Sequence, residues 1–137
     1  NNCGFSISPP KEWSSSDSML FRNNSLGSEI KLSCKPDGFE NNYYVLFTSA
    51  QSLMTKPDSG FYTTSAENVM VGGRKAYLFS ETHKTGGIEN YELVLMIDSG
   101  IKNASKNQMD IIYAYMPGKY KSQYGVILKD ALYSYKR

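Results

Sequence analysis

The sequence has little of what enzymes and metal sites usually require. Its 137 residues include one histidine, His83, and two cysteines. Zinc sites are normally built from histidine and cysteine, so a site here would depend on carboxylates. A general base needs a nucleophile and an orienting group. His83 lies in a polar run near Glu81 and Lys84, where we expect it at the surface. We therefore expect no catalytic residue, no metal and no cofactor.

Basic clusters and long apolar runs are also missing. The 15 Lys and Arg residues against 13 Asp and Glu give a net charge of +2, and only three residues are Arg. No basic stripe is present, so nucleic acid is not an expected partner. The chain has no run of 18 apolar residues that could form a transmembrane helix. It starts at Asn1 and not at Met, so we expect a processed or trimmed product, from which any signal peptide or upstream membrane anchor has been removed.

Two short motifs imitate a catalytic signature. Lys84-Thr85-Gly86 and Ser28-Glu29-Ile30-Lys31 match elements of penicillin-binding enzymes. The serine-aspartate-asparagine element is absent, and 137 residues are too few for that fold. We therefore reject this interpretation.

Carboxylates are the remaining catalytic candidates, because a pair of them can hydrolyse a glycoside. They are Glu89, Glu92, Asp98 and Asp110. Alternation places Glu92 and Asp98 on one face of a strand, where we expect an exposed polar edge. A small carboxylate-dependent hydrolase remains a third hypothesis for the function.

Cys3 and Cys34 each lie in a short run typical of a strand. If residues 3–8 and 29–35 lie side by side, the two thiols can form a disulfide. Closing a loop of this size contributes about 3–4 kcal/mol in the chain-entropy model. The alternative is a pair of reduced thiols. We favour the disulfide, which implies an exported protein of the periplasm or cell envelope.

The strongest local signal is Gly72-Gly73, which separates two β-prone runs. Both turn positions can adopt φ > 0 without steric cost, so a hairpin is predicted. Strand-like runs at 91–98 and 108–116 extend it into an antiparallel meander over residues 60–116, with loops at 82–90 and 99–107. Both runs are apolar on both faces, which is typical of a sheet that is covered on both sides.

The segments before the meander are more varied. Residues 4–8 alternate as a strand does, and Pro9-Pro10 end it. The Trp13 side chain is expected to pack against the core beneath a loop. Residues 14–28 form a polar stretch with one apolar patch, Met19-Leu20-Phe21, and have no clear pattern. Residues 28–33 alternate again and predict a strand.

Helical periodicity occurs twice. Seven apolar residues between Phe39 and Met54 favour a helix over the alternative of a strand, with Asp37 and Glu40 in the form of a capping box and a turn at 56–60 as its end. A second apolar stripe runs from Tyr120 to Tyr135 and predicts an amphipathic C-terminal helix.

Three stretches carry a family resemblance. They are Phe5-Ser6-Ile7-Ser8-Pro9-Pro10 followed by Trp13, Val71-Gly72-Gly73-Arg74-Lys75-Ala76-Tyr77, and the stripe from Tyr120 to Tyr135. They resemble the opening, the hairpin and the last helix of the PsbP/Mog1-like superfamily, which includes DcrB-like bacterial envelope lipoproteins. The resemblance implies an α-β-α sandwich with a central antiparallel sheet and no shared catalytic residues. Members of this superfamily are mainly accessory or partner-binding proteins.

The sequence thus predicts a single α+β domain over residues 1–137, with its sheet covered by helices on both faces. We expect a non-enzymatic, envelope-located module that binds a protein partner. The alternative is an immunity-type inhibitor that blocks a toxic periplasmic enzyme, because 11 tyrosines in a small disulfide-bearing domain suit the plugging of a cleft. Tyr115, Lys119 and Lys121 lie at a strand-to-helix corner and are the predicted protein contacts.

Overall fold

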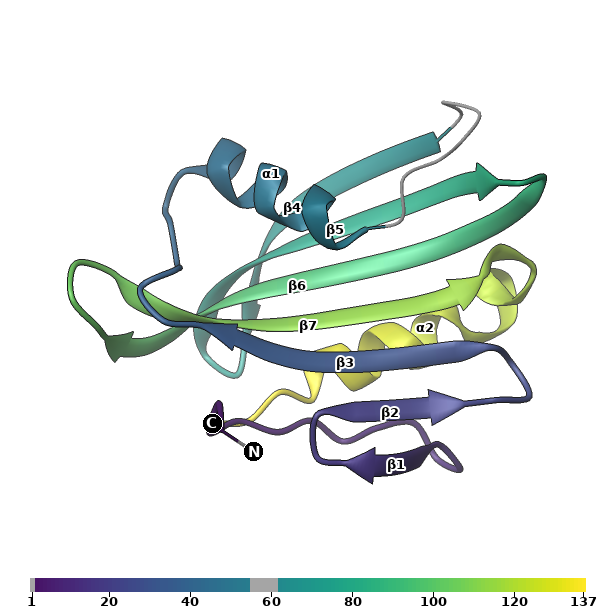
Figure 1. The fold of residues 1–137 in the computed structure, drawn as a ribbon, viewed down its shortest axis with the longest axis horizontal. Coiled ribbons are helices and arrows are strands. Elements are labelled where there is room, and N and C mark those ends of the chain that lie inside the picture. Colours follow the sequence, from purple (N-terminus) through teal and green to yellow (C-terminus); the bar gives the residue numbers. More distant parts are fainter. Residues whose placement is uncertain (1, 55–61) are drawn as a thin grey trace.

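The computed structural model describes residues 2–54 and 62–137, which form an antiparallel sheet and two α-helices (Figure 1). The strand order is β1-β2-β3-β7-β6-β5-β4. The strands are β1 (Ser14–Asp17), β2 (Leu20–Asn23), β3 (Ser28–Lys35), β4 (Tyr62–Val71), β5 (Arg74–Thr85), β6 (Ile88–Lys102) and β7 (Asn107–Pro117). The predicted meander is therefore present as β4 to β7. The predicted turn at 56–60 lies outside the described residues.

Glycine pairs form two of the hairpin turns. Gly72 and Gly73 have φ values of 57° and 74° and join β4 to β5, as predicted. Gly86 and Gly87 have φ values of 58° and 78° and join β5 to β6 in the same way. The predicted loop at 82–90 was wrong, because its polar residues remain paired between the two strands as far as the glycines. The loop predicted at 99–107 is also shorter, since β6 continues through a bulge to Lys102.

The side chains of the central strands alternate between two cores. On β6, Leu93, Leu95 and Ile97 belong to the first core, and Val94 and Met96 belong to the second. This alternation on both faces follows the pattern predicted from the sequence.

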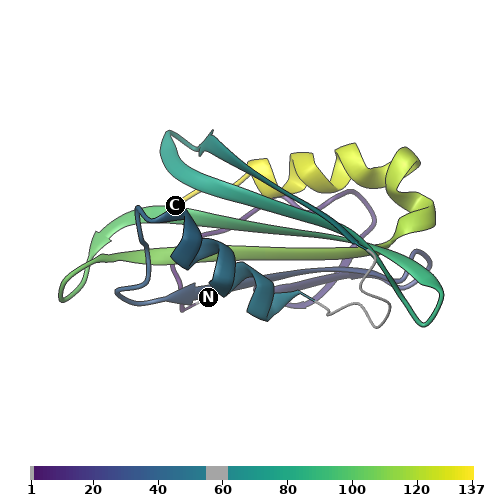
Figure 2. The same cartoon turned by 90° about the horizontal axis from the view of Figure 1, so that it is seen from above.

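Each helix contributes to one core. Helix α2 (Lys121–Tyr133), which follows a short 3-10 helix η1 (Gly118–Tyr120), packs Leu128 and Leu132 into the first core. Helix α1 (Tyr43–Leu53) packs Leu46 and Ala50 into the second. Figure 2 shows the two helices as separate elements, α2 in yellow and α1 in blue, each beside strands of the sheet. The α+β class and the C-terminal helix are confirmed. No helix in the described part of the chain is long and apolar enough to cross a membrane.

Helix α1 begins later than predicted, and its cap is different. Asn42 is the N-cap, and its side chain accepts a hydrogen bond from the Tyr44 backbone nitrogen at 2.9 Å. The predicted capping box was wrong because Asp37 has φ 55° and lies outside the helix. Its carboxylate accepts hydrogen bonds from the backbone nitrogen and the hydroxyl of Ser105, and from the Lys106 backbone nitrogen. Asp37 therefore connects the loop before α1 to the β6–β7 turn.

The N-terminal segment carries the predicted disulfide. Cys3 and Cys34 are bonded, with their Cα atoms 5.7 Å apart. The strand predicted at 4–8 is reduced to one bridge, in which Ser6 pairs with Lys136 near the C-terminus. Phe5 nevertheless points into the first core, with Trp13 packed at its margin as predicted. The segment is thus held by burial and a disulfide more than by a ladder of hydrogen bonds.

The stretch at 14–28 forms the hairpin of β1 and β2 and the start of β3. The side chains of its apolar patch face the core, since Met19 and Phe21 pack against the first core. The polar residues around them pair along the edge of the sheet.

Candidate functional site

The sheet face that carries α1 has an apolar half and a polar half. Beneath α1 it is apolar, with residues such as Phe79, Val94 and Met96. Alternate positions of the same strands continue this face as polar or aromatic residues. These residues are Glu81 and His83 on β5, Asn90 and Glu92 on β6, and Tyr113 and Tyr115 on β7. The candidate site lies in this polar half.

A buried cluster of Glu81, His83 and Glu92 forms the floor of the polar half. Glu81 lies directly opposite Glu92 in the ladder, and His83 is two residues further along β5. Their side chains are on central strands, and the residues are 5%, 1% and 0% exposed. The predictions of a surface His83 and an exposed Glu92 were therefore wrong, because both residues lie inside paired strands and not in a loop or at an edge.

The geometry of this acid–histidine cluster is compact. One ligand-type atom from each of the three residues lies within 4.8 Å of the others. His83 Nε2 is 3.6 Å from Glu92 Oε2, and the Tyr113 hydroxyl donates to Glu92 Oε1 at 2.9 Å. Burial raises the pKa of the Glu81 carboxyl, while the charge of His83 lowers it and that of Glu92 raises it. An imidazole and two carboxylates at this spacing can share a proton or ligate a cation.

A half-exposed surface of Arg22, Glu29, Lys31, Tyr113 and Tyr115 lies beside the cluster, and we call it the tyrosine surface. Arg22 Nε is 3.3 Å from Glu29 Oε2, and Glu29 and Lys31 lie opposite Tyr115 and Tyr113 in the β3–β7 ladder. Four of the five residues (Lys31 excepted) line a shallow pocket of about 440 Å³. Tyrosines with charged neighbours of both signs are typical of protein interfaces.

The three predicted contact residues do not share one surface. Tyr115 donates to Asn90 Oδ1 at 2.8 Å on the α1 side of the sheet. Lys121 Nζ lies 4.8 Å from the centre of the Tyr91 ring, which belongs to the first core on the opposite side. Lys119 lies over the ring of Tyr120, which packs against that same core. Contact of these residues with a partner stays a prediction.

The candidate catalytic carboxylates are also dispersed. Asp110 is fully buried and is held by Arg137 and Tyr135, on the first-core side of the sheet. Glu92 lies on the other side, and Asp98 accepts from Gly100 and Asn107 near the β6–β7 turn. Glu92 and Asp110 therefore lie on opposite sides of the sheet.

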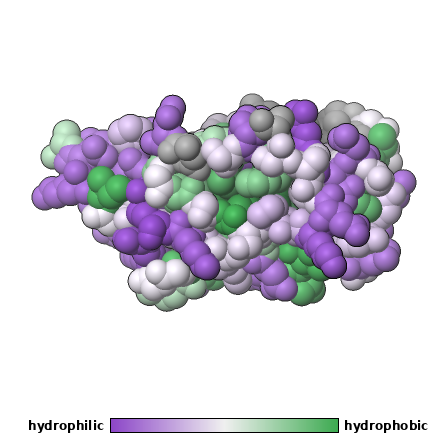
Figure 3. All heavy atoms as spheres, turned by 90° about the horizontal axis from the view of Figure 1, so that it is seen from below, coloured by the Kyte–Doolittle hydropathy of each residue, from purple (hydrophilic) through white to green (hydrophobic). Residues whose placement is uncertain are grey.

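A second surface lies on the side of β1 and α2. Pro10, Trp13, Leu26, Tyr124 and Ile127 help to line a groove of about 360 Å³. On the side of the molecule seen in Figure 3, an apolar patch is flanked by hydrophilic side chains at both ends. The groove that Trp13 and Tyr124 help to line also contains one residue of each charge, Lys11 and Glu12.

Sequence reasoning missed Glu81 and most of the tyrosine surface. Glu81 and His83 continue the alternation of Tyr77 and Phe79, so a face that changes from aromatic to ionisable was visible in the sequence. Arg22, Glu29 and Lys31 gave no such signal, because their position beside Tyr113 and Tyr115 depends on the pairing of β3 with β7.

No protein-family model matches the sequence, and no curated protein matches it. Solved structures do match its fold. PsbP (CyanoP) from Synechocystis sp. PCC 6803 has a TM-score of 0.57 at 9% identity, covering 97% of this chain and 81% of that chain. LpqN, involved in cell envelope biogenesis of Mycobacterium tuberculosis, has a TM-score of 0.59 at 14% identity, with 95% and 78% covered.

A third structure extends the similarity to a protein of unknown function. PA94 from Pseudomonas aeruginosa has a TM-score of 0.58 at 10% identity, covering 95% of this chain and 94% of that chain. Together these structures confirm the PsbP/Mog1-like fold that the sequence predicted.

Proposed function

We propose that this protein is a non-enzymatic accessory module of the cell envelope that binds a protein partner through the tyrosine surface. The observation that carries the proposal is the position of Tyr113 and Tyr115, half-buried between charges of both signs. Tyrosine offers apolar area and a hydroxyl at low entropic cost, and such residues dominate binding energy at interfaces.

The envelope location rests on two further observations. The Cys3–Cys34 disulfide suits an oxidising compartment such as a periplasm. One protein with the same fold, LpqN, is involved in cell envelope biogenesis. We extend that location to this chain, and with it the predicted likeness to DcrB-like envelope lipoproteins. We also assign α1 and α2 to the outer layers of the expected α-β-α sandwich.

The absence of an enzymatic role is part of the proposal. The acid–histidine cluster contains a potential base, but its three residues are at most 5% exposed. Glu92 and Asp110, the carboxylates of the hydrolase hypothesis, lie on opposite sides of the sheet. A substrate could not contact both at once, so the geometry gives that hypothesis little support.

The test is a crosslinking pull-down from native extract with the wild-type chain and two charge-reversal variants. Lys31→Glu reverses a charge on the tyrosine surface, where the Lys31 side chain is 63% exposed. Lys102→Glu is the matched control, an exposed strand lysine at the β6–β7 turn. We expect Lys31→Glu to reduce recovery of the partner about tenfold, a loss of about 1.4 kcal/mol in binding. The control should bind like the wild type.

The outcome also separates the two binding hypotheses. Envelope scaffold proteins as the recovered partners support the accessory module. A single stoichiometric enzyme whose activity falls on binding would favour the immunity-type inhibitor. Equal recovery by the wild type and Lys31→Glu would contradict the assignment of the tyrosine surface.

A further inference from the structure

We propose that Glu81, His83 and Glu92 form a binding site for one divalent transition-metal ion of the Zn²⁺ type. The site adjoins the tyrosine surface on the same half of the sheet, and Tyr113 contributes to both. The strand pairing itself creates it, because Glu81 and His83 share one face of β5 and Glu92 is the cross-strand partner of Glu81. Side chains in these positions point to the same side of a sheet.

The distances fit a first-row ion after a small adjustment. Zinc bonds of about 2.0–2.2 Å place tetrahedral ligand atoms about 3.3 Å apart. His83 Nε2 and Glu92 Oε2 are 3.6 Å apart, and all three ligand atoms lie within 4.8 Å of one another. Rotation of a glutamate side chain can supply the remaining shift. The acid–histidine cluster is the one group of three such residues found in the described part of the chain.

The charges of the cluster favour a cation. Two carboxylates within a buried site repel each other and lose hydration, which is costly unless the charge is balanced. A dication would neutralise both carboxylates, and the imidazole nitrogen would complete a donor set of one nitrogen and two oxygens, which suits Zn²⁺, Co²⁺ or Mn²⁺.

Tyr113 supports the cluster from β7. Its hydroxyl donates to Glu92 Oε1 at 2.9 Å, which leaves Oε2 directed toward His83. Hydrogen bonds of this kind orient the carboxylate ligands of metal sites. Tyr113 is therefore a positioning residue. The same side chain belongs to the tyrosine surface, so a bound ion would also order part of the proposed interface.

The test uses the whole chain with its disulfide intact. The protein is treated with a chelator and titrated with Zn²⁺ by calorimetry. The titration is repeated on protein refolded with Zn²⁺ present, since the site is buried. We expect one Zn²⁺ per chain and a Tm several degrees higher. Co²⁺ should give visible absorption bands of a site whose protein ligands are one nitrogen and two oxygens.

Substitutions assign the site. His83→Gln and Glu92→Gln should each weaken Zn²⁺ binding more than tenfold, and Glu81→Gln should do the same while closely preserving side-chain shape. Tyr113→Phe should weaken binding about tenfold through orientation alone. Glu89→Gln is the matched control on the exposed end of β6 and should leave the affinity within twofold. The proposal is overturned if the wild type shows no stoichiometric binding, or if binding survives in His83→Gln and Glu92→Gln. If these two variants fail to fold, an unchanged affinity in Glu81→Gln would overturn it.

Discussion

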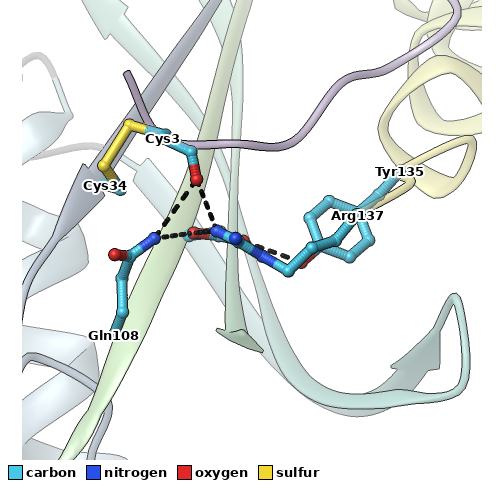
Figure 4. Close-up of a disulfide and its surroundings, with 6 residues drawn as sticks. Cys3, Cys34, Gln108, Tyr135 and Arg137 are labelled. Carbon is cyan, nitrogen blue, oxygen red and sulfur yellow. Dashed lines mark hydrogen bonds and ion pairs between the residues drawn. A yellow bond between two sulfur atoms is a disulfide. The ribbon is translucent and has the colours of Figure 1, made fainter. Parts of the chain in front are cut away.

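Arg137 and Asp110 form a two-point ion pair that ties the C-terminus to the sheet. Arg137 Nη2 donates to Asp110 Oδ1 at 2.8 Å, and Arg137 Nε donates to Oδ2 at 3.0 Å. Arg137 Nη2 also donates to the carbonyl of Cys3 at 2.6 Å, as does Gln108 Nε2 at 3.4 Å (Figure 4). The two ends of the described chain are thus joined through one buried carboxylate on β7.

Arg137→Met should strongly destabilise the fold. Asp110 is fully buried, and the variant leaves its charge without the guanidinium. Breaking a buried pair in this way costs about 3 kcal/mol. Urea unfolding followed by circular dichroism measures the loss. The double variant with Asp110→Asn should recover part of it, because the uncompensated charge is gone. A loss below about 1 kcal/mol in the single variant would show that the pair is not the anchor we describe.

Tyr135→Phe should change how stability depends on alkaline pH. Burial and the hydrogen bond to Asp110 raise the pKa of Tyr135 to about 12, whereas a tyrosine in the unfolded chain titrates near pH 10. Below pH 10 the Tyr135 hydroxyl is protonated in both the folded and the unfolded state. Between about pH 10 and 12 only the folded state holds this proton, so the free energy of unfolding falls as pH rises.

In Tyr135→Phe the fall in the free energy of unfolding with rising pH should be smaller by the contribution of one proton. At neutral pH the variant should lose about 1 kcal/mol with its hydrogen bond. Unfolding curves at pH 9, 10 and 11 provide the measurement. Tyr91, Tyr115 and Tyr133, whose pKa values are also raised, titrate in both proteins and serve as the common background. Identical slopes would contradict the assigned role of Tyr135.

Local patterns allowed much of the fold to be predicted. Gly72-Gly73 fixes its turn through backbone conformation alone, and the alternation on β6 gives both faces of the strand without knowledge of its neighbours. The prediction of the α1 cap was wrong because it depended on a contact between distant parts of the chain. Asp37 had the right chemistry three residues before Glu40, but a contact with Ser105, far along the chain, places it outside the helix.

The candidate site was harder to predict because burial depends on the whole sheet. Alternation assigned Glu92 to the correct face but could not show that strands on both sides enclose it. His83 appeared to be in a loop because its neighbours are polar. A polar loop and the polar part of a long central hairpin cannot be distinguished from the sequence. The disulfide was predicted from the cysteine pair, although the N-terminal segment pairs with Lys136 and not with β3.

Loss of the disulfide should cost about 3–4 kcal/mol in the chain-entropy model. Cys3 and Cys34 are 31 residues apart, and opening the bond frees that loop in the unfolded chain. The double variant Cys3→Ser with Cys34→Ser avoids a free thiol, and its urea midpoint measures the change. Alkylation of unfolded, unreduced wild-type protein is the independent check. Two labelled thiols would mean that the disulfide does not form in solution.

The Gly72-Gly73 turn allows a matched pair of substitutions. Both residues have positive φ, so alanine at either position costs about 1 kcal/mol of backbone strain. The surroundings differ. A Cβ atom at Gly72 would lie 3.2 Å from the Tyr135 carbonyl oxygen, whereas one at Gly73 would meet no atom within 4 Å.

Gly72→Ala should therefore destabilise the protein more than Gly73→Ala, by about a further 1 kcal/mol, because a tight contact must be relieved in addition to the strain. Gly73→Asn should be milder than Gly73→Ala, since asparagine tolerates this conformation. Chemical unfolding of the three variants measures the order. If the two alanine variants lose the same free energy of unfolding, the backbone at Tyr135 can move away from Gly72 without cost. That would also contradict the anchoring of this segment by Asp110, because a residue held in place by its hydroxyl cannot move away from the turn without cost.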